Sequence, residues 1–375
     1  MHTRKTKIVA TIGRTSSGDM ELYGMIHTGM NGARIDLSEA SYEEHQKVIA
    51  KIRAISDKLH TAVAVIQDRD ETDKPEVSEE DLEFAIANKV DFITLPNVKK
   101  SDNVKKLRES IKKKKGDVSI LARIETKEAV EDLDAIILAS DGLIVDRDIL
   151  SAIITDENVT LLQKVIIKKA IGAGKPVIIA TKMLESMISD PAPTGTEVNE
   201  VTNAILDGTD AILLSEETSF GRHVVLTIET LSRIALNTER SAIFEEDVTK
   251  FERDSRGIVD AVSEAAAVTA KNVGAEAIIA LSEKGFTPRM IARFKPIQPI
   301  FVLTPHVSTY RKIILSFGCA PEMIESVETL HEAISLSKKL LERKKLLRHG
   351  DRFVLAAGIP FGQSGGTNMI SIQTI

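Results

Sequence analysis

Residues 121–145 read LARIETKEAVEDLDAIILASDGLIV, and this segment decides the fold. The apolar run that ends at Arg123 and Glu125 predicts a strand, the middle predicts a helix, and GLIV predicts a second strand. Because side chains alternate along a strand, Arg123 and Glu125 point to the same face. This unit therefore presents an acid and a base side by side, where a metal ion and a charged substrate can be held.

The same arrangement recurs along the first 240 residues. Eight short apolar runs lack polar alternation, which is typical of parallel strands covered on both sides. Amphipathic segments lie between them, most clearly at 42–55 and 161–173. Eight such units predict an α/β protein with a (β/α)₈ TIM barrel over residues 1–240. The predicted strands are 6–13, 32–38, 62–68, 91–96, 119–125, 142–146, 177–181 and 211–217.

Charged and polar side chains gather at the carboxyl ends of these predicted strands. In a barrel of this kind those ends form the active-site face. Barrel packing prefers apolar side chains, so packing does not explain this concentration of charge. The sequence therefore predicts a site made of Arg34, Asp36, Asp68, Arg123, Glu125, Asp146, Thr181 and Glu217.

Residues 241–375 predict a smaller C-terminal α/β domain. A strongly charged stretch at 236–258 marks the boundary, and an alanine-rich helix is expected at 259–273. Short apolar runs then predict strands at 277–281, 299–304, 321–325, 352–358 and 369–375. Two loops in this domain offer hydroxyl groups and backbone N–H groups, which suit either an ordinary tight turn or an anion site. Their candidate phosphate ligands are Ser282, Glu283, Lys284, Gly285, Thr287, Ser364, Gly365 and Gly366.

Composition restricts the class of protein further. The net charge of −6 argues against a nucleic-acid partner, and the absence of tryptophan argues against stacking on single strands. The single cysteine, Cys319, excludes a disulfide within the chain and reads as a small buried side chain. No apolar run reaches about 18 residues, so no transmembrane helix is expected. The first residues resemble no leader, and we expect a cytoplasmic location.

Several segments resemble the pyruvate kinase family. They are TKIVATIG (6–13), GMNGARIDLS (29–38), the long run from Ala173 to Gly221, LSEKGFTPRMIARFKP (281–296) and GQSGGTN (362–368). The resemblance implies a homo-oligomer that binds small phosphorylated metabolites, with an effector site at the two C-terminal loops. Members of that family insert a lid domain after the third barrel strand. Here only the short loop 69–81, with a capping box expected at 78–81, lies at that point, so the lid is absent.

The resemblance also implies roles for residues at the barrel mouth. Arg34 matches the arginine that grips the substrate phosphate, and Thr181 matches a threonine beside the reacting centre. Arg123 stands in place of the catalytic lysine. Arginine keeps the positive charge, but it is bulkier and cannot donate a proton at neutral pH.

The implied cation sites are altered. Glu125 matches a ligand of Mg²⁺ or Mn²⁺, but the second ligand position falls on Ile149, with Asp148 one residue early. A displacement by one residue reverses the direction of a side chain on a strand. The implied K⁺ ligands are Asp36, Ser38 and Asp68, with Asp36 in place of an asparagine.

Three functions remain open from the sequence. The first is phosphoryl transfer between phosphoenolpyruvate and ADP, which we expect to be impaired or lost. The second is a non-catalytic paralogue that binds a phosphorylated metabolite or a partner. The third is a metal-dependent lyase or aldolase acting on a pyruvate-like acid, because IETKEAVE (124–131) resembles such aldolases.

Overall fold

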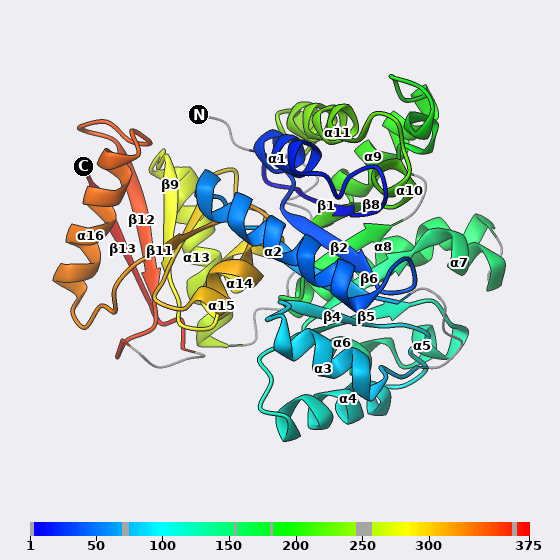
Figure 1. Cartoon of the computed structure of the whole chain (residues 1–375). Helices are drawn as coiled ribbons and strands as arrows, with labels where there is room; N and C mark the ends of the chain where they lie inside the picture. Colours follow the sequence, from blue (N-terminus) through cyan, green and yellow to red (C-terminus); the bar gives the residue numbers. More distant parts are fainter. Residues whose placement is uncertain (1–3, 70–74, 154–155, 181–182, 245–256, 362–365) are drawn as a thin grey trace. The chain divides into compact units, whose positions relative to one another are not determined.

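The computed structural model describes residues 4–69, 75–153, 156–180, 183–244, 257–361 and 366–375 (Figure 1). The chain divides into two compact units. One is Thr6–Phe244, and the other holds Arg4, Lys5 and the described residues that follow Phe244. Among the helices in these ranges, none is both long enough and apolar enough to cross a membrane.

Eight parallel strands close the first unit into a barrel, as the sequence predicts. Each strand pairs with the next, and the first pairs with the last. Nearly every strand residue is buried, because helices cover the outside and side chains fill the inside. The strands are β1 (Lys7–Thr11), β2 (Gly32–Asp36), β3 (Ala64–Asp68), β4 (Phe92–Leu95), β5 (Ser119–Ile124), β6 (Gly142–Asp146), β7 (Val177–Ala180) and β8 (Ala211–Leu214).

Helices connect these strands around the outside of the barrel. The long helix α2 (Tyr42–Leu59) begins with a capping box in which Ser41 and Glu44 exchange hydrogen bonds, and it buries Ile49 and Ile52. The remaining elements are α1 (Asp19–Thr28), α3 (Glu79–Ala87), α4 (Ser101–Lys113), α5 (Lys127–Glu131), α6 (Leu133–Ala139), α7 (Arg147–Ile153), α8 (Asp156–Gly172), η1 (Glu185–Ile188), α9 (Gly195–Leu206), α10 (Glu216–Ser219) and α11 (Val224–Glu239).

The connection after β3 leaves no room for a further domain. Strand β3 ends at Asp68 and helix α3 begins at Glu79. The Ser78 hydroxyl accepts a hydrogen bond from the Asp81 N–H, so the predicted cap is present. A capping box would also need the Asp81 side chain to accept from the Ser78 N–H, and that part of the prediction is wrong. The Asp81 carboxylate instead accepts from Arg69, at 2.7 and 2.9 Å, and from the Tyr42 hydroxyl. The two ends of the short loop are thereby tied together.

The second unit contains a five-stranded sheet in the order β11-β10-β9-β12-β13, with β13 antiparallel. In Figure 1 the sheet has α16 on one side and α13, α14 and α15 on the other. Alternate residues of β9 explain these two layers: Ile278 packs toward α13 and α14, and Ile279 packs toward α16. The elements are α13 (Ile258–Asn272), β9 (Ala277–Leu281), α14 (Phe286–Ala292), β10 (Ile300–Thr304), α15 (Val307–Lys312), η2 (Ile313–Leu315), β11 (Cys319–Met323), α16 (Leu330–Arg343), β12 (Arg352–Ala357) and β13 (Met369–Thr374).

Several predicted strand ends differ from the observed ones by one to three residues, and two of these differences have a clear physical cause. The eighth strand ends at Leu214, because the Glu217 carboxylate accepts a hydrogen bond from the Ser215 N–H and the chain turns into α10. Strand β11 begins at the buried Cys319, two residues earlier than predicted, since its first residue pairs with Ile300 in the sheet. Side-chain capping and sheet pairing decide both ends, and neither can be seen in an apolar run.

Candidate functional site

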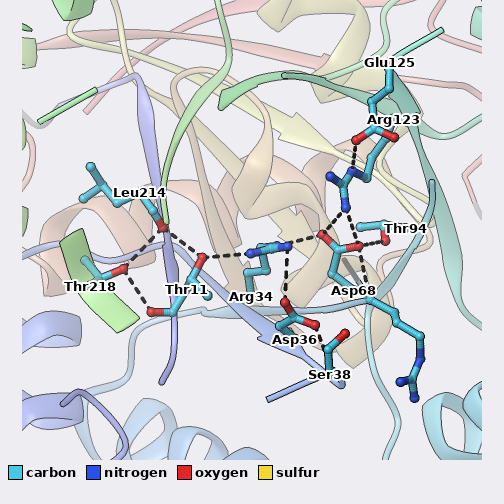
Figure 2. A network of polar contacts seen from close by, with 11 residues as sticks. Thr11, Arg34, Asp36, Ser38, Asp68, Thr94, Arg123, Glu125, Leu214 and Thr218 are labelled. Atoms are coloured by element: carbon cyan, nitrogen blue, oxygen red, sulfur yellow. Dashed lines mark hydrogen bonds and ion pairs between the residues drawn. The ribbon is translucent and has the colours of Figure 1, made fainter. Parts of the chain in front are cut away.

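Two arginines and three carboxylates form a buried ion-pair network at the carboxyl ends of β2, β3 and β5 (Figure 2). Arg34 lies on β2, and its Nε donates to Asp68 Oδ2 at 2.7 Å. Its Nη1 donates to the Thr11 hydroxyl at 3.3 Å. Thr11 lies in register with Arg34 on the neighbouring strand, so the parallel pairing brings these groups together.

Arg123 lies between two carboxylates. Its Nη1 is 3.3 Å from Asp68 Oδ1 and 3.4 Å from Oδ2, and its Nε is 2.5 Å from Glu125 Oε1. All three side chains are at least nine-tenths buried. The predicted shared face of Arg123 and Glu125 is therefore real, and the guanidinium lies directly against the carboxyl group on it.

Asp68 is the centre of the network. Besides both arginines, its Oδ1 accepts from the Thr94 hydroxyl and from the Arg69 N–H. Burial alone raises the pKa of a carboxyl, but the nearby charges of Arg123 and Arg34 outweigh it, and the pKa of Asp68 lies well below its ordinary value. Asp68 is therefore ionised, and its acceptor positions are filled by the protein.

Glu125 behaves differently. Its Oε2 accepts from the Asn97 N–H at 2.9 Å. Burial nevertheless raises the pKa of Glu125, although the charge of Arg123 and the Asn97 bond favour the ionised form. The end of β3 thus holds a carboxylate that stays charged to low pH, and the end of β5, two strands away, holds a carboxyl group that resists ionisation.

Two of the predicted K⁺ ligands, Asp36 and Asp68, lie together and are contacted by protein groups. Asp36 and Asp68 are in register on β2 and β3. The Asp36 Oδ1 accepts from the Ser38 N–H at 2.9 Å, and its Oδ2 is 3.9 Å from Arg34 Nη2. One oxygen of Asp36 is therefore engaged by a backbone N–H group, and the other lies within ion-pair distance of a guanidinium.

The predicted second ligand of a divalent ion is not supplied by the described side chains. Asp146 ends β6, and its Oδ1 accepts from the Ile149 N–H at 3.3 Å. Ile149 is 37% exposed, and both Ile149 and Asp148 lie in α7. The Asp148 side chain lies outside the described residues, as does Thr181. Within the described ranges, no group of three or more histidine, cysteine, aspartate or glutamate residues could hold a metal ion.

Glu217, predicted at the mouth, has a local structural role. It is 3% exposed, and its oxygens accept from the Leu184 and Ser215 N–H groups. Burial raises the pKa of this carboxyl, while the backbone bonds favour the ionised form. These bonds join the loops that follow β7 and β8.

Sequence reasoning missed three residues of the network. Thr11, Thr94 and Asn97 all contact its charged groups. The signal for the two threonines was present, because each is a polar residue at or next to the end of an otherwise apolar strand. Asn97 contacts Glu125 through its backbone N–H, and the identity of a residue does not indicate where its backbone N–H points.

A second candidate site lies in the second unit. A pocket there is lined by Ser282, Glu283, Lys284, Thr287 and Gly366, so the two predicted loops do come together. The Thr367 hydroxyl donates to the Thr287 hydroxyl at 2.8 Å and joins the loops.

The backbone of this pocket requires glycine at two positions. A Cβ atom at Gly358 would lie 2.1 Å from the Gly366 carbonyl oxygen. Gly285 has a φ of 74° just before α14. Ser364 and Gly365 lie outside the described residues.

A closed (β/α)₈ barrel with a charged mouth, joined to a smaller α/β unit, defines a class of two-unit barrel proteins. The barrel domain of pyruvate kinase matches residues 3–78 and 71–228, and its alpha/beta domain matches residues 260–373. The chain belongs to the pyruvate kinase family.

Individual pyruvate kinases are also similar to this chain. A pyruvate kinase of Geobacillus stearothermophilus is 30% identical, over 99% of this chain and 80% of that protein. One of Sporosarcina psychrophila is 38% identical, over 79% of this chain and 51% of that protein. The first alignment spans 475 positions, more than the 375 residues of this chain, so that relative carries segments that this chain lacks.

Proposed function

We propose that this chain is a pyruvate kinase family member that does not transfer phosphoryl groups at the barrel mouth and instead binds a phosphorylated metabolite in the pocket of its second unit. The observation that carries the first half is the position of Arg123, which contacts both Asp68 and Glu125. A cytoplasmic location and a homo-oligomeric state belong to the same proposal, as expectations from the family.

The charge of the network supports the loss of phosphoryl transfer. Two guanidinium groups face three carboxylates, so the cluster carries no excess positive charge to attract phosphoenolpyruvate and ADP. Catalysis of such a transfer depends on positioning and on neutralising the phosphates, usually with metal ions. The missing lid also leaves the mouth without the closure that excludes water.

The pocket of the second unit supports the binding half. Lys284 is exposed at its edge and supplies a positive charge, and Ser282 and Thr287 supply hydroxyl donors. Glu283 also lines the pocket, but His306 lies 2.5 Å from its carboxylate and offsets that charge when protonated. Donors and a cation around one concave surface suit a phosphate group.

Residual phosphoryl transfer is the second candidate, because Arg34 and Glu125 remain at the mouth. The lyase alternative needs a divalent ion on Glu125. Both alternatives require the Glu125 carboxylate, which Arg123 now contacts. They therefore depend on displacing this side chain.

The binding half is tested by thermal shift of the full chain with inorganic phosphate and with sugar mono- and bisphosphates. We expect a sugar phosphate to raise the Tm of the wild type and to lose that effect in Lys284→Ala. Lys339→Ala, an exposed lysine on α16, is the matched control and should keep the effect. No shift with any of these ligands, or equal shifts in all three proteins, would contradict the binding site.

The catalytic half is tested by a lactate dehydrogenase-coupled assay with phosphoenolpyruvate, ADP, Mg²⁺ and K⁺. Losing one electrostatic stabiliser typically reduces kcat by about 10²–10³. With more than one lost, we expect turnover at least about 10⁴-fold below the usual 1–10³ s⁻¹. Turnover within that usual range would overturn the proposal.

A further inference from the structure

We propose that the Arg123 guanidinium is a tethered cation that takes the place of a free metal ion at the barrel mouth, so that the chain binds no divalent cation on Glu125. This goes beyond the proposed function, because it concerns the cation chemistry of the barrel and not the ligand of the second unit. It also makes a claim that holds whether or not a phosphorylated metabolite binds.

The first argument is position. The guanidinium contacts Asp68 through Nη1, at 3.3 and 3.4 Å, and Glu125 through Nε, at 2.5 Å. Figure 2 shows it between the two carboxylates. A cation that bridged these groups would have to occupy the same space. Because Arg123 is covalently attached and buried, it is present at every salt concentration.

The second argument is that protein groups already contact the carboxylate oxygens that a metal ion would need. Magnesium takes six oxygen ligands at about 2.0–2.1 Å in a near-octahedral arrangement, of which one or two are usually protein carboxylates and several are waters. Asp68 already accepts from Arg34, Thr94 and the Arg69 N–H in addition to Arg123. The second oxygen of Glu125 accepts from the Asn97 N–H. Glu125 Oε1 accepts no hydrogen bond from the described residues, but the Arg123 guanidinium lies 2.5 Å from it. An ion could reach this oxygen only in place of the guanidinium, so the described side chains, as they are arranged, do not fit a divalent ion.

The third argument is repulsion. An ion that reached Glu125 would lie within a few ångströms of the Arg123 charge, in a site from which water is largely excluded. Like charges interact strongly there, because screening by solvent is weak. A divalent ion could bind only if the guanidinium moved away from both carboxylates, which would leave Asp68 with Arg34 alone as its ionic partner.

The test is a Mn²⁺ titration of the full-length wild type and Glu125→Gln, followed by electron paramagnetic resonance of the free ion. We expect both proteins to bind the same amount of Mn²⁺. A site present in the wild type and lost in Glu125→Gln would overturn the proposal. This comparison needs no change at Arg123, so it holds even if variants of that residue fail to fold.

A second measurement asks whether the guanidinium excludes the ion. Arg123→Ala should gain one Mn²⁺ site, and Arg123→Ala with Glu125→Gln should lose it again. Arg108→Ala is the matched control, because Arg108 pairs with Asp141 at a partly exposed position away from the mouth, and it should gain no site. If folded Arg123→Ala binds no more Mn²⁺ than the wild type, the guanidinium is not what keeps the ion out.

Discussion

Arg123 and Asp68 are 55 positions apart in the sequence, yet Arg123 Nη1 lies 3.3 Å from Asp68 Oδ1 and 3.4 Å from Oδ2. Asp68 also contacts Arg34 at 2.7 Å, so one carboxylate serves two arginines. The barrel brings them together because β2, β3 and β5 end on the same face. This shared counter-ion makes the barrel mouth sensitive to the loss of any one of the three side chains.

Asp68→Asn should strongly destabilise the barrel unit. It leaves two buried guanidinium groups without their shared counter-ion, and removing one partner of a buried ion pair typically costs about 3–5 kcal/mol. Urea unfolding followed by circular dichroism measures the loss. Asp134→Asn is the control, because Asp134 pairs with Lys169 at 74% exposure. It should change the unfolding free energy by no more than about 0.5 kcal/mol, and equal losses in the two variants would count against the network.

Thr94→Val should remove one donor from Asp68 with little change in shape. The Thr94 hydroxyl donates to Asp68 Oδ1, and hydrogen bonds to charged groups contribute about 1.5–3 kcal/mol. We expect a loss of about 2 kcal/mol in the unfolding free energy. Thr202→Val removes a hydroxyl that donates only to the Val198 carbonyl within α9, and it should cost less than about 1 kcal/mol. If the Thr202 variant loses more stability, the hydroxyl of Thr94 is not part of the network.

Glu125→Gln should change the pH dependence of stability in a defined direction. Burial raises the pKa of Glu125 above its ordinary value of 4.5. A carboxyl with a raised folded pKa contributes stability that is complete below pH 4.5 and is lost as pH rises through the folded pKa. The wild type should therefore lose stability relative to Glu125→Gln as pH rises from 4.5 toward neutrality. Unfolding free energies of both proteins across this range measure the difference, and a flat or opposite trend would argue against it.

Asp68 should act with the opposite sign. The charges of Arg123 and Arg34 hold the pKa of Asp68 below its ordinary value of 3.8, against the effect of burial. Its contribution is present above pH 3.8 and is lost as pH falls through the lower folded pKa. Wild type and Thr94→Val should therefore both lose stability below pH 3.8, with the loss beginning at higher pH in the variant, which lacks one donor to the carboxylate. Acid unfolding curves of the two proteins measure this onset.

Much of the fold could be predicted from the sequence. Short apolar runs without polar alternation identify buried parallel strands, and the order β1 to β8 follows from their succession along the chain. The carboxyl ends of these strands could also be assigned to the functional face. Strand ends were harder, because Glu217 turns the chain at Ser215 through a local hydrogen bond that a pattern of apolar residues does not contain.

The state of the site could be predicted only in part. Alternation along β5 places Arg123 and Glu125 on one face, and the structure pairs them. The sequence does not show how far a side chain extends across the barrel. It therefore could not decide whether the Asp68 carboxylate binds a metal cation or pairs with Arg123, as it does in the structure. That difference depends on the length and direction of side chains on strands that are not adjacent in the chain. The predicted roles of Thr181, Asp148, Ser364 and Gly365 stay predictions, since these residues or their side chains lie outside the described part of the structure.

A double-mutant cycle on Arg123 and Asp68 tests the central claim most directly. It compares the unfolding free energies of wild type, Arg123→Met, Asp68→Asn and the double variant in urea. If the two side chains neutralise each other, the double variant should lose less stability than the sum of the single losses, by roughly 2 kcal/mol. Single losses that add to within about 0.5 kcal/mol would show that the two residues are independent, and would contradict mutual neutralisation at the barrel mouth.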